Sequence, residues 1–89
     1  ARNVERLEEL AKALCEAGHQ VEHFAADVTK QADIDRLQNE VATKFGKLDL
    51  LCNCVGQSTR GAALDTSPED FQSLLDVNFL SSVRMTRAL

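Results

Sequence analysis

The run LDLLC at residues 48–52, followed directly by NCVG at residues 53–56, decides the fold class of this chain. The first run has one charged residue and no regular polar alternation, which is typical of a strand covered on both faces in a parallel sheet. From Asn53 to Thr66 the chain is polar and punctuated by glycine, which predicts a loop. We therefore predict a buried strand over Leu48–Cys52 that ends in a polar turn.

Two amphipathic helices are predicted before this strand. Residues 4–17 carry apolar side chains at helical spacing, and Gly18 stands where a left-handed C-cap needs a residue without Cβ. Residues 31–45 carry a second apolar stripe, with Thr29 as the expected N-cap and Gly46 as the closing residue.

The remaining elements complete an alternating pattern. A short strand is predicted over Val21–Ala26, ending at Asp27. A further helix is predicted from Pro68, with the Ser67 hydroxyl as N-cap, and it continues to Leu89. The order helix, strand, helix, strand, loop, helix indicates an α/β fold with a parallel sheet.

Composition excludes several classes of function. The chain has 89 residues and a net charge of −4, with no basic run that could follow a phosphate backbone, so no nucleic-acid partner is expected. No apolar run is long enough for a membrane span and no signal-peptide pattern is present, so a cytoplasmic protein is expected. Cys15, Cys52 and Cys54 suit neither a disulfide framework nor a zinc site, and no metal is expected.

Candidate functional residues lie where the predicted strands end, because ligands of open parallel sheets bind beyond the carboxyl ends of the strands. Asp27-Val28-Thr29 follows the first strand and residues 53–56 follow the second. Asp27 could instead help to cap the next helix, and Asn53 and Gly56 could be ordinary turn residues. Asn78 is an amide on an apolar helical stripe, so it is either held at a site or satisfied by neighbouring backbone.

Together these residues resemble the short-chain dehydrogenase/reductase family. The resemblance rests on Asp27-Val28, on FGKLDLL at residues 45–51, on NCVG at 53–56 and on Val77-Asn78, and it covers essentially all 89 residues. It implies part of a doubly wound parallel-sheet Rossmann fold. Residues 1–89 would be an incomplete NAD(P)-binding domain that lacks the first two strands and everything after the helix ending near residue 89.

The resemblance also implies a cofactor site. Asp27 resembles the carboxylate that accepts a hydrogen bond from the adenine amino group, and Val28 the residue that flanks this ring. Asn53, Val55 and Gly56 match the family's Asn-Asn-Ala-Gly turn, which passes close to the cofactor ribose.

The resemblance also implies a catalytic role for Asn78 and a cofactor preference from Ala1 and Arg2. Asn78 resembles the asparagine of the catalytic tetrad, whose main-chain carbonyl holds a water of the proton relay. Ala1 matches the position where members that prefer NAD carry an acid, and Arg2 follows it. Since a guanidinium is a good partner for a 2′-phosphate, NADP(H) is favoured over NAD(H), although Arg2 could also be a solvated residue beside a helix start.

The sequence departs from the family pattern at several points. Cys54 and Val55 replace the usual second Asn and Ala, and Ser81 stands where many members have glycine. The chain contains no tyrosine, hence no Tyr-x-x-x-Lys motif, and it has no glycine-rich phosphate turn. These 89 residues alone are therefore expected to be inactive.

The resemblance implies that the parent protein is an NADP(H)-dependent oxidoreductase. It would interconvert a carbonyl and an alcohol on a small molecule by hydride transfer, and it would form a homo-oligomer through the helix starting at Pro68. One alternative is a non-catalytic nucleotide-binding or regulatory protein that retains the Rossmann fold. Another is a small autonomous interaction domain.

Overall fold

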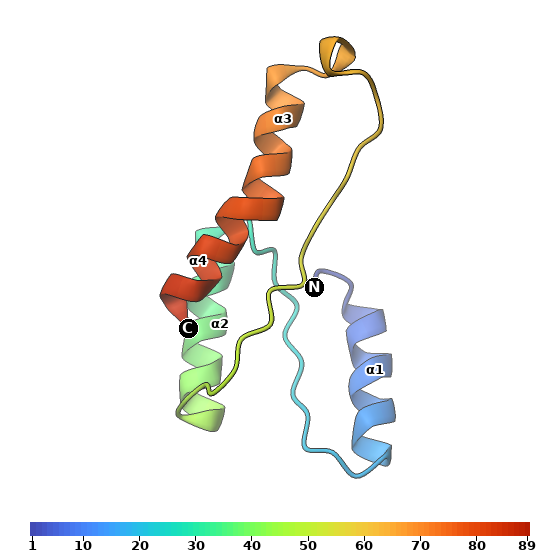
Figure 1. Cartoon of the computed structure of the whole chain (residues 1–89). Helices are drawn as coiled ribbons and strands as arrows, with labels where there is room; N and C mark the ends of the chain where they lie inside the picture. The colour runs from blue at the N-terminus through green and yellow to red at the C-terminus, as the bar shows by residue number, and fades with distance from the viewer.

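The computed structural model describes all 89 residues and contains helices joined by long irregular segments (Figure 1). The elements are α1 (Val4–Glu16), α2 (Gln31–Phe45), η1 (Ala63–Asp65), α3 (Pro68–Leu75), η2 (Asp76–Leu80) and α4 (Ser81–Ala88). The last three form one continuous column, and its α4 end packs against α2, whereas α1 stands apart. None of the helices combines the length and the apolar character that crossing a membrane requires.

The ends of α1 follow from the local sequence. The Asn3 side chain accepts a hydrogen bond from the Arg6 amide at 3.1 Å, which caps the N-terminus. At the other end, Gly18 has φ of 95°. Its amide donates to the Cys15 carbonyl, and the His19 amide donates to the Leu14 carbonyl. This is the Schellman arrangement, so the closing role predicted for Gly18 is confirmed.

The start of α2 differs from the prediction. Its N-cap is Lys30, which provides no side-chain hydrogen bond, so the prediction of Thr29 as N-cap is wrong. The reason is that the Thr29 hydroxyl donates to the Asp27 carboxylate. The helix itself spans Gln31–Phe45 and ends at Gly46 with φ of 78°, as the sequence predicts.

Neither predicted strand forms in this structure. Val21–Ala26 and Leu48–Cys52 run as irregular segments with no ladder between them (Figure 1). The two segments correspond to the third and fourth strands of the expected fold. In the doubly wound order 3-2-1-4-5 two other strands lie between these, so the two segments are not expected to pair with each other. A single main-chain bond of sheet type is present, from the Ala26 amide to the Ala1 carbonyl at 3.0 Å.

The column at the C-terminal side is not the uninterrupted α-helix that the sequence predicts. It begins as expected, with the Ser67 hydroxyl accepting from the Asp70 amide at 3.1 Å and with Pro68 in the first turn. Asp76–Leu80 then forms a π-helical turn. Directly after it, Ser81 is buried and its hydroxyl donates to the Val77 carbonyl, so the polar group is satisfied.

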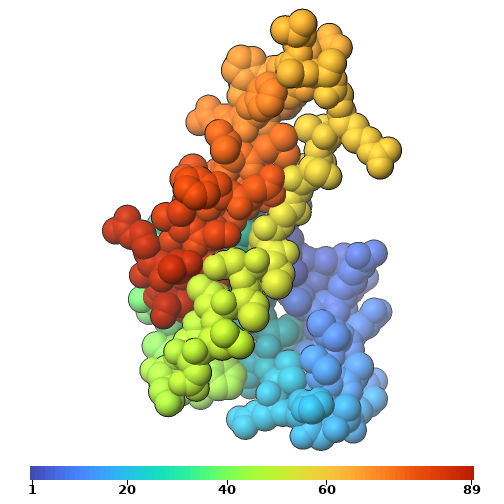
Figure 2. All heavy atoms as spheres, in the orientation of Figure 1, coloured from blue at the N-terminus to red at the C-terminus, as the bar shows by residue number.

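The molecule is open rather than close-packed. Its exposed surface is 7051 Å², whereas a compact monomer of this mass exposes about 5,200 Å². Its radius of gyration is 15.6 Å, against about 12 Å for a compact chain of this length. The buried residues are few: Ala11, Ala26, Ile34 and Ser81. Figure 2 shows the resulting elongated outline, with the loop before α3 forming an arm at one end.

Candidate functional site

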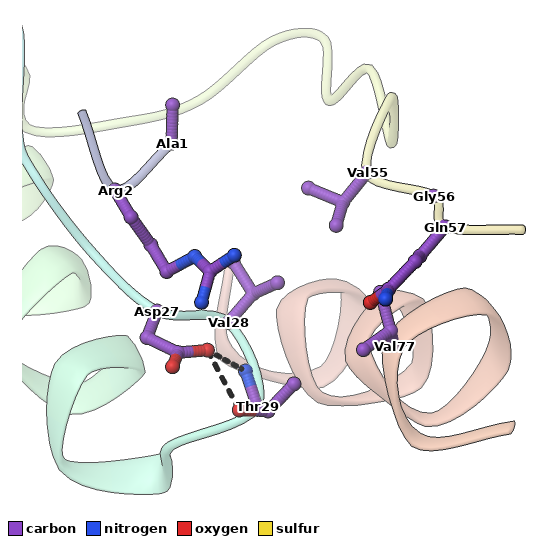
Figure 3. Close-up of a pocket in the computed structure, with 9 residues that line it drawn as sticks. All are labelled: Ala1, Arg2, Asp27, Val28, Thr29, Val55, Gly56, Gln57 and Val77. Carbon is purple, nitrogen blue, oxygen red and sulfur yellow. Dashed lines mark hydrogen bonds between the residues drawn. The ribbon is translucent and has the colours of Figure 1, made fainter. Parts of the chain in front are cut away.

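A cavity of about 300 Å³ brings together three parts of the chain that are distant in sequence (Figure 3). The segment before α1, the turn before α2 and the turn before the long loop meet there, together with one residue of η2. The lining residues are Ala1, Arg2, Asp27, Val28, Thr29, Val55, Gly56, Gln57 and Val77. Five of the six residues predicted to bind the cofactor are therefore neighbours, namely Arg2, Asp27, Val28, Val55 and Gly56.

The turn at Asp27 is fixed by its own side chain. Oδ1 of Asp27 accepts from the Thr29 amide at 3.0 Å and from the Thr29 hydroxyl at 2.6 Å. The Lys30 amide donates to the Asp27 carbonyl at 2.9 Å. These bonds form an Asx turn, so Asp27 does take part in the entry to α2. Its Oδ2 accepts no hydrogen bond within the chain, and Figure 3 shows the Arg2 side chain extending over this turn.

Charge and hydrogen bonding stabilise the ionised form of Asp27. The Thr29 hydroxyl and then the Thr29 amide lower the pKa of Asp27 below its usual value of 3.8, with Arg2 and Lys30 adding smaller electrostatic effects in the same direction. Burial acts in the opposite sense but is outweighed. Asp27 is therefore an anionic acceptor at neutral pH.

We expect Thr29→Val to raise the pKa of Asp27 toward 3.8 in the intact protein, because the hydroxyl donor is lost while the amide donor remains. A depressed folded-state pKa stabilises the protein above the unfolded value, and this stability is lost as pH falls through the folded value. The variant should therefore be less stable than the unaltered protein at neutral pH, and it should lose less stability as the pH falls below the unfolded value. NMR titration of the Asp27 carboxyl measures the shift, with Thr29→Ser as control. An unchanged pKa in Thr29→Val would contradict the assignment.

Asn78 holds the turn on the other side of the cavity. Its Oδ1 accepts from the Gln57 amide at 2.7 Å, and its Nδ2 donates to the Gln57 carbonyl at 2.8 Å. The side chain thus pairs with both main-chain groups of one residue, 21 positions earlier. Of the two interpretations left open by the sequence, the side chain is satisfied by backbone. That backbone belongs to the site, since Gln57 lines the cavity.

Gly56 lies beside the Asn78 side chain that is bonded to Gln57. A Cβ added to Gly56 would stand 3.4 Å from Oδ1 of Asn78, at the tight end of van der Waals contact. The Asn78 side chain therefore lies directly beside Gly56, and an alanine methyl group at this position would be in ordinary van der Waals contact with it. The π-helical turn that carries Asn78 is of the kind that is frequent at functional sites.

Asn53 is the predicted cofactor residue that does not line the cavity. Its Nδ2 instead donates to the Thr86 hydroxyl at 3.4 Å, so this side chain is directed to α4. The structure therefore separates Asn53 from Val55 and Gly56, although all three belong to one turn.

Several residues of the site were missed in the sequence. Thr29 belongs to the candidate segment at the end of the first predicted strand and was expected to cap the next helix, but its bond to the Asp27 carboxylate was not predicted, although Asp-x-Thr is a pattern that favours a local side-chain turn. Gln57 contributes its main chain, which no side-chain pattern can indicate. Val77 lies beside Asn78 and could have been inferred from that position alone.

Comparison with known proteins agrees with this geometry. The family model for short chain dehydrogenases matches residues 1–89, and the chain therefore belongs to the short-chain dehydrogenase family, a family of oxidoreductases. An uncharacterized oxidoreductase of Bacillus subtilis is 40% identical over 88 residues, covering 99% of this chain and 25% of that protein. A carboxyl-CoA reductase of Mycobacterium tuberculosis is 36% identical over 84 residues, covering 93% of this chain and 32% of that protein.

Solved structures agree in backbone course. An L-sorbose reductase from Gluconobacter frateurii, complexed with NADPH and L-sorbose, superposes with a TM-score of 0.93 at 31% identity, covering all of this chain and 34% of that one. A short chain dehydrogenase from Mycobacterium smegmatis gives a TM-score of 0.91 at 32% identity, with coverage of 98% and 36%. The chain therefore spans about a third of these structures, and its backbone follows their α/β Rossmann fold.

Proposed function

We propose that this chain forms the adenosine side and the central turn of the cofactor site of an NADP(H)-dependent oxidoreductase. The observation that carries the proposal is the cavity in which Arg2 and Asp27 face the Val55–Gln57 turn. The membership of the family supports the oxidoreductase class, and the sorbose reductase with NADPH bound is a related protein of that kind.

The residues of the cavity fit the adenosine half of such a dinucleotide. The Arg2 guanidinium can pair with a 2′-phosphate, and the neighbouring Ala1 has no carboxylate to repel it. Oδ2 of Asp27 is available to accept from an adenine amino group, and Val28 can flank the ring. Gly56 leaves the main chain of the turn open to close approach. When bound, the dinucleotide would donate a hydride to a carbonyl in its reduced form or accept one from an alcohol in its oxidised form.

Asn78 would act on the proton side of the reaction. Because its amide oxygen and nitrogen each bond to the main chain of Gln57, its side chain positions the turn. We therefore assign any direct part in the proton relay to its main-chain carbonyl, which would hold a water molecule. Asn53 would support this arrangement from the α4 side through Thr86.

The substrate and the assembly are proposed at the level of class. A small molecule with a carbonyl or hydroxyl group is the expected substrate. The column from Pro68 to Ala88 exposes apolar side chains that a second copy of the protein could cover: Phe71, Leu75, Phe79, Leu80 and Val83. We therefore propose a homo-oligomer formed through this helix.

Arg2→Ala tests the cofactor preference in the intact protein. We expect the affinity for NADPH to fall about 10- to 100-fold, since a charge-assisted pair with the 2′-phosphate is lost, whereas NADH affinity should change little. Arg6→Ala removes the same charge four residues later on the exposed surface of α1 and serves as control. Titration of cofactor fluorescence gives both affinities.

Three outcomes would revise the proposal. Tighter binding of NADH than of NADPH by the unaltered protein would make it NAD-dependent. NADPH binding without consumption in the presence of carbonyl compounds would favour the non-catalytic nucleotide-binding alternative. Absence of any dinucleotide binding would overturn the proposal itself.

A further inference from the structure

Two side chains of α2 hold the main chain that leads into the cavity. Oδ2 of Asp33 accepts from the Asp27 amide at 2.8 Å. Nη2 of Arg36 donates to the Ala25 carbonyl at 2.7 Å and lies 3.5 Å from Oδ1 of Asp33. The pair therefore grips the chain on both sides of Ala26, whose own amide is bonded to Ala1.

These contacts restrain Asp27, the residue whose carboxylate lines the cavity. Asp27 is fixed at three main-chain or side-chain points: its amide by Asp33, its carbonyl by the Lys30 amide and its Oδ1 by Thr29. Only Oδ2 is left without a partner inside the chain. The hydrogen bond from the Asp27 amide to Asp33 sets the orientation of the Asp27 backbone, and it therefore also sets the direction in which Oδ2 points.

The ion pair alone does not explain the arrangement. The Arg36 side chain is 59% exposed, and ion pairs on the surface contribute about 0–1 kcal/mol to stability. An acid in the first turn of a helix is also favourable for the helix dipole, which is a purely structural role for Asp33. In addition, one oxygen of Asp33 accepts from the Asp27 amide and the other forms an ion pair with Arg36. The Arg36 charge offsets that of Asp33, which lies near the second carboxylate, Asp27.

We propose that Asp33 and Arg36 are positioning residues that determine recognition of the adenine base. They aim Oδ2 of Asp27 at the exocyclic amino group without touching the nucleotide themselves. This inference rests on the proposed cofactor function of the cavity. It predicts that their loss weakens discrimination between bases more than it weakens binding of the dinucleotide as a whole.

The test compares NADPH with nicotinamide hypoxanthine dinucleotide phosphate, which lacks the adenine amino group. The intact, unaltered protein should prefer NADPH by about 10-fold or more, as expected for one hydrogen bond to a charged acceptor. In Asp33→Ala this preference should fall to about two- to threefold. Asp33→Asn should give an intermediate ratio, because its Oδ1 can still accept from the Asp27 amide, and Arg36→Gln should lower the ratio as well.

Asp35→Ala is the matched control. Asp35 is on the same helix and has the same charge, but it pairs only with the Gln31 amide group, at 2.9 Å. Its affinity ratio should equal that of the unaltered protein. A purely structural role for Asp33 would weaken both nucleotides together and leave the ratio unchanged.

The outcomes separate this inference from the proposed function. If the unaltered protein prefers NADPH but Asp33→Ala and Arg36→Gln keep the same ratio, the positioning role is overturned while the cofactor site stands. If Asp33→Ala does not fold, the ratio of Asp33→Asn relative to Asp35→Ala decides in the same way. If the unaltered protein binds neither nucleotide, both proposals fail.

Discussion

Replacing Asn78 by Ala in the intact protein is expected to lower kcat/KM by about 100-fold. The variant loses both hydrogen bonds to the main chain of Gln57, at 2.7 and 2.8 Å, and with them the position of the turn at Gly56. A displacement of about 1 Å in a site of this kind costs about 100-fold in rate. The main-chain carbonyl of residue 78 remains, so the loss measures what the side chain contributes. Steady-state kinetics with NADPH and a carbonyl substrate provide the measurement.

Two other variants define the origin of this effect. Asn78→Asp keeps an acceptor for the Gln57 amide but places an oxygen against the Gln57 carbonyl, so it should be as impaired as Asn78→Ala. Asn39→Ala removes an exposed amide from α2 and should retain full activity. The free energy of unfolding of Asn78→Ala should fall by about 2 kcal/mol, from two hydrogen bonds of about 1 kcal/mol each. Unchanged kinetics in Asn78→Ala would contradict the positioning role.

Residues 1–89 expressed by themselves are expected to have no catalytic activity and no cooperative unfolding transition. Large apolar side chains that would face a sheet are exposed, such as Leu50 at 77%. The excess surface described above means that too little apolar area is buried to offset the conformational entropy of folding. We expect poorly dispersed amide signals in the NMR spectrum, or aggregation, and no consumption of NADPH.

The intact protein is the control for this experiment, and it should give dispersed signals and a cooperative melt. One outcome would contradict this prediction. A soluble monomer of residues 1–89 that melts cooperatively would show that the helices and the open cavity are sufficient for a stable fold. It would also support the small autonomous domain that the sequence left as an alternative.

Features that depend on neighbouring residues could be predicted from the sequence. Gly18, Gly46 and Ser67 end or begin helices through local backbone conformation and local hydrogen bonds, and all three are found where expected. The grouping of Arg2 and Asp27 with the turn at Gly56 could be predicted as well. It follows from the family resemblance and not from any local pattern.

Features that depend on distant partners could not be predicted in the same way. The segments at Val21–Ala26 and Leu48–Cys52 have strand-like sequences, but a strand needs a neighbour, and the doubly wound order does not make them neighbours. Thr29 fits both a helix cap and an Asx turn, and only the position of the Asp27 carboxylate decides between them. The partner of Asn78 is a main-chain group, which has no signature in the sequence.

The π-helical turn at Asp76–Leu80 takes up one residue more than an α-helical turn would, and this fixes how the two halves of the helix are oriented to each other. Each residue of an α-helix turns the chain by about 100°, so winding the same residues as an even α-helix would rotate one half against the other by about that angle. Asn78 would then lose its hydrogen bonds to Gln57, or Ser81 would leave its buried position. The π-helical turn thus allows one helix to make two separate contacts, one between Asn78 and the turn at Gln57 and one between α4 and α2.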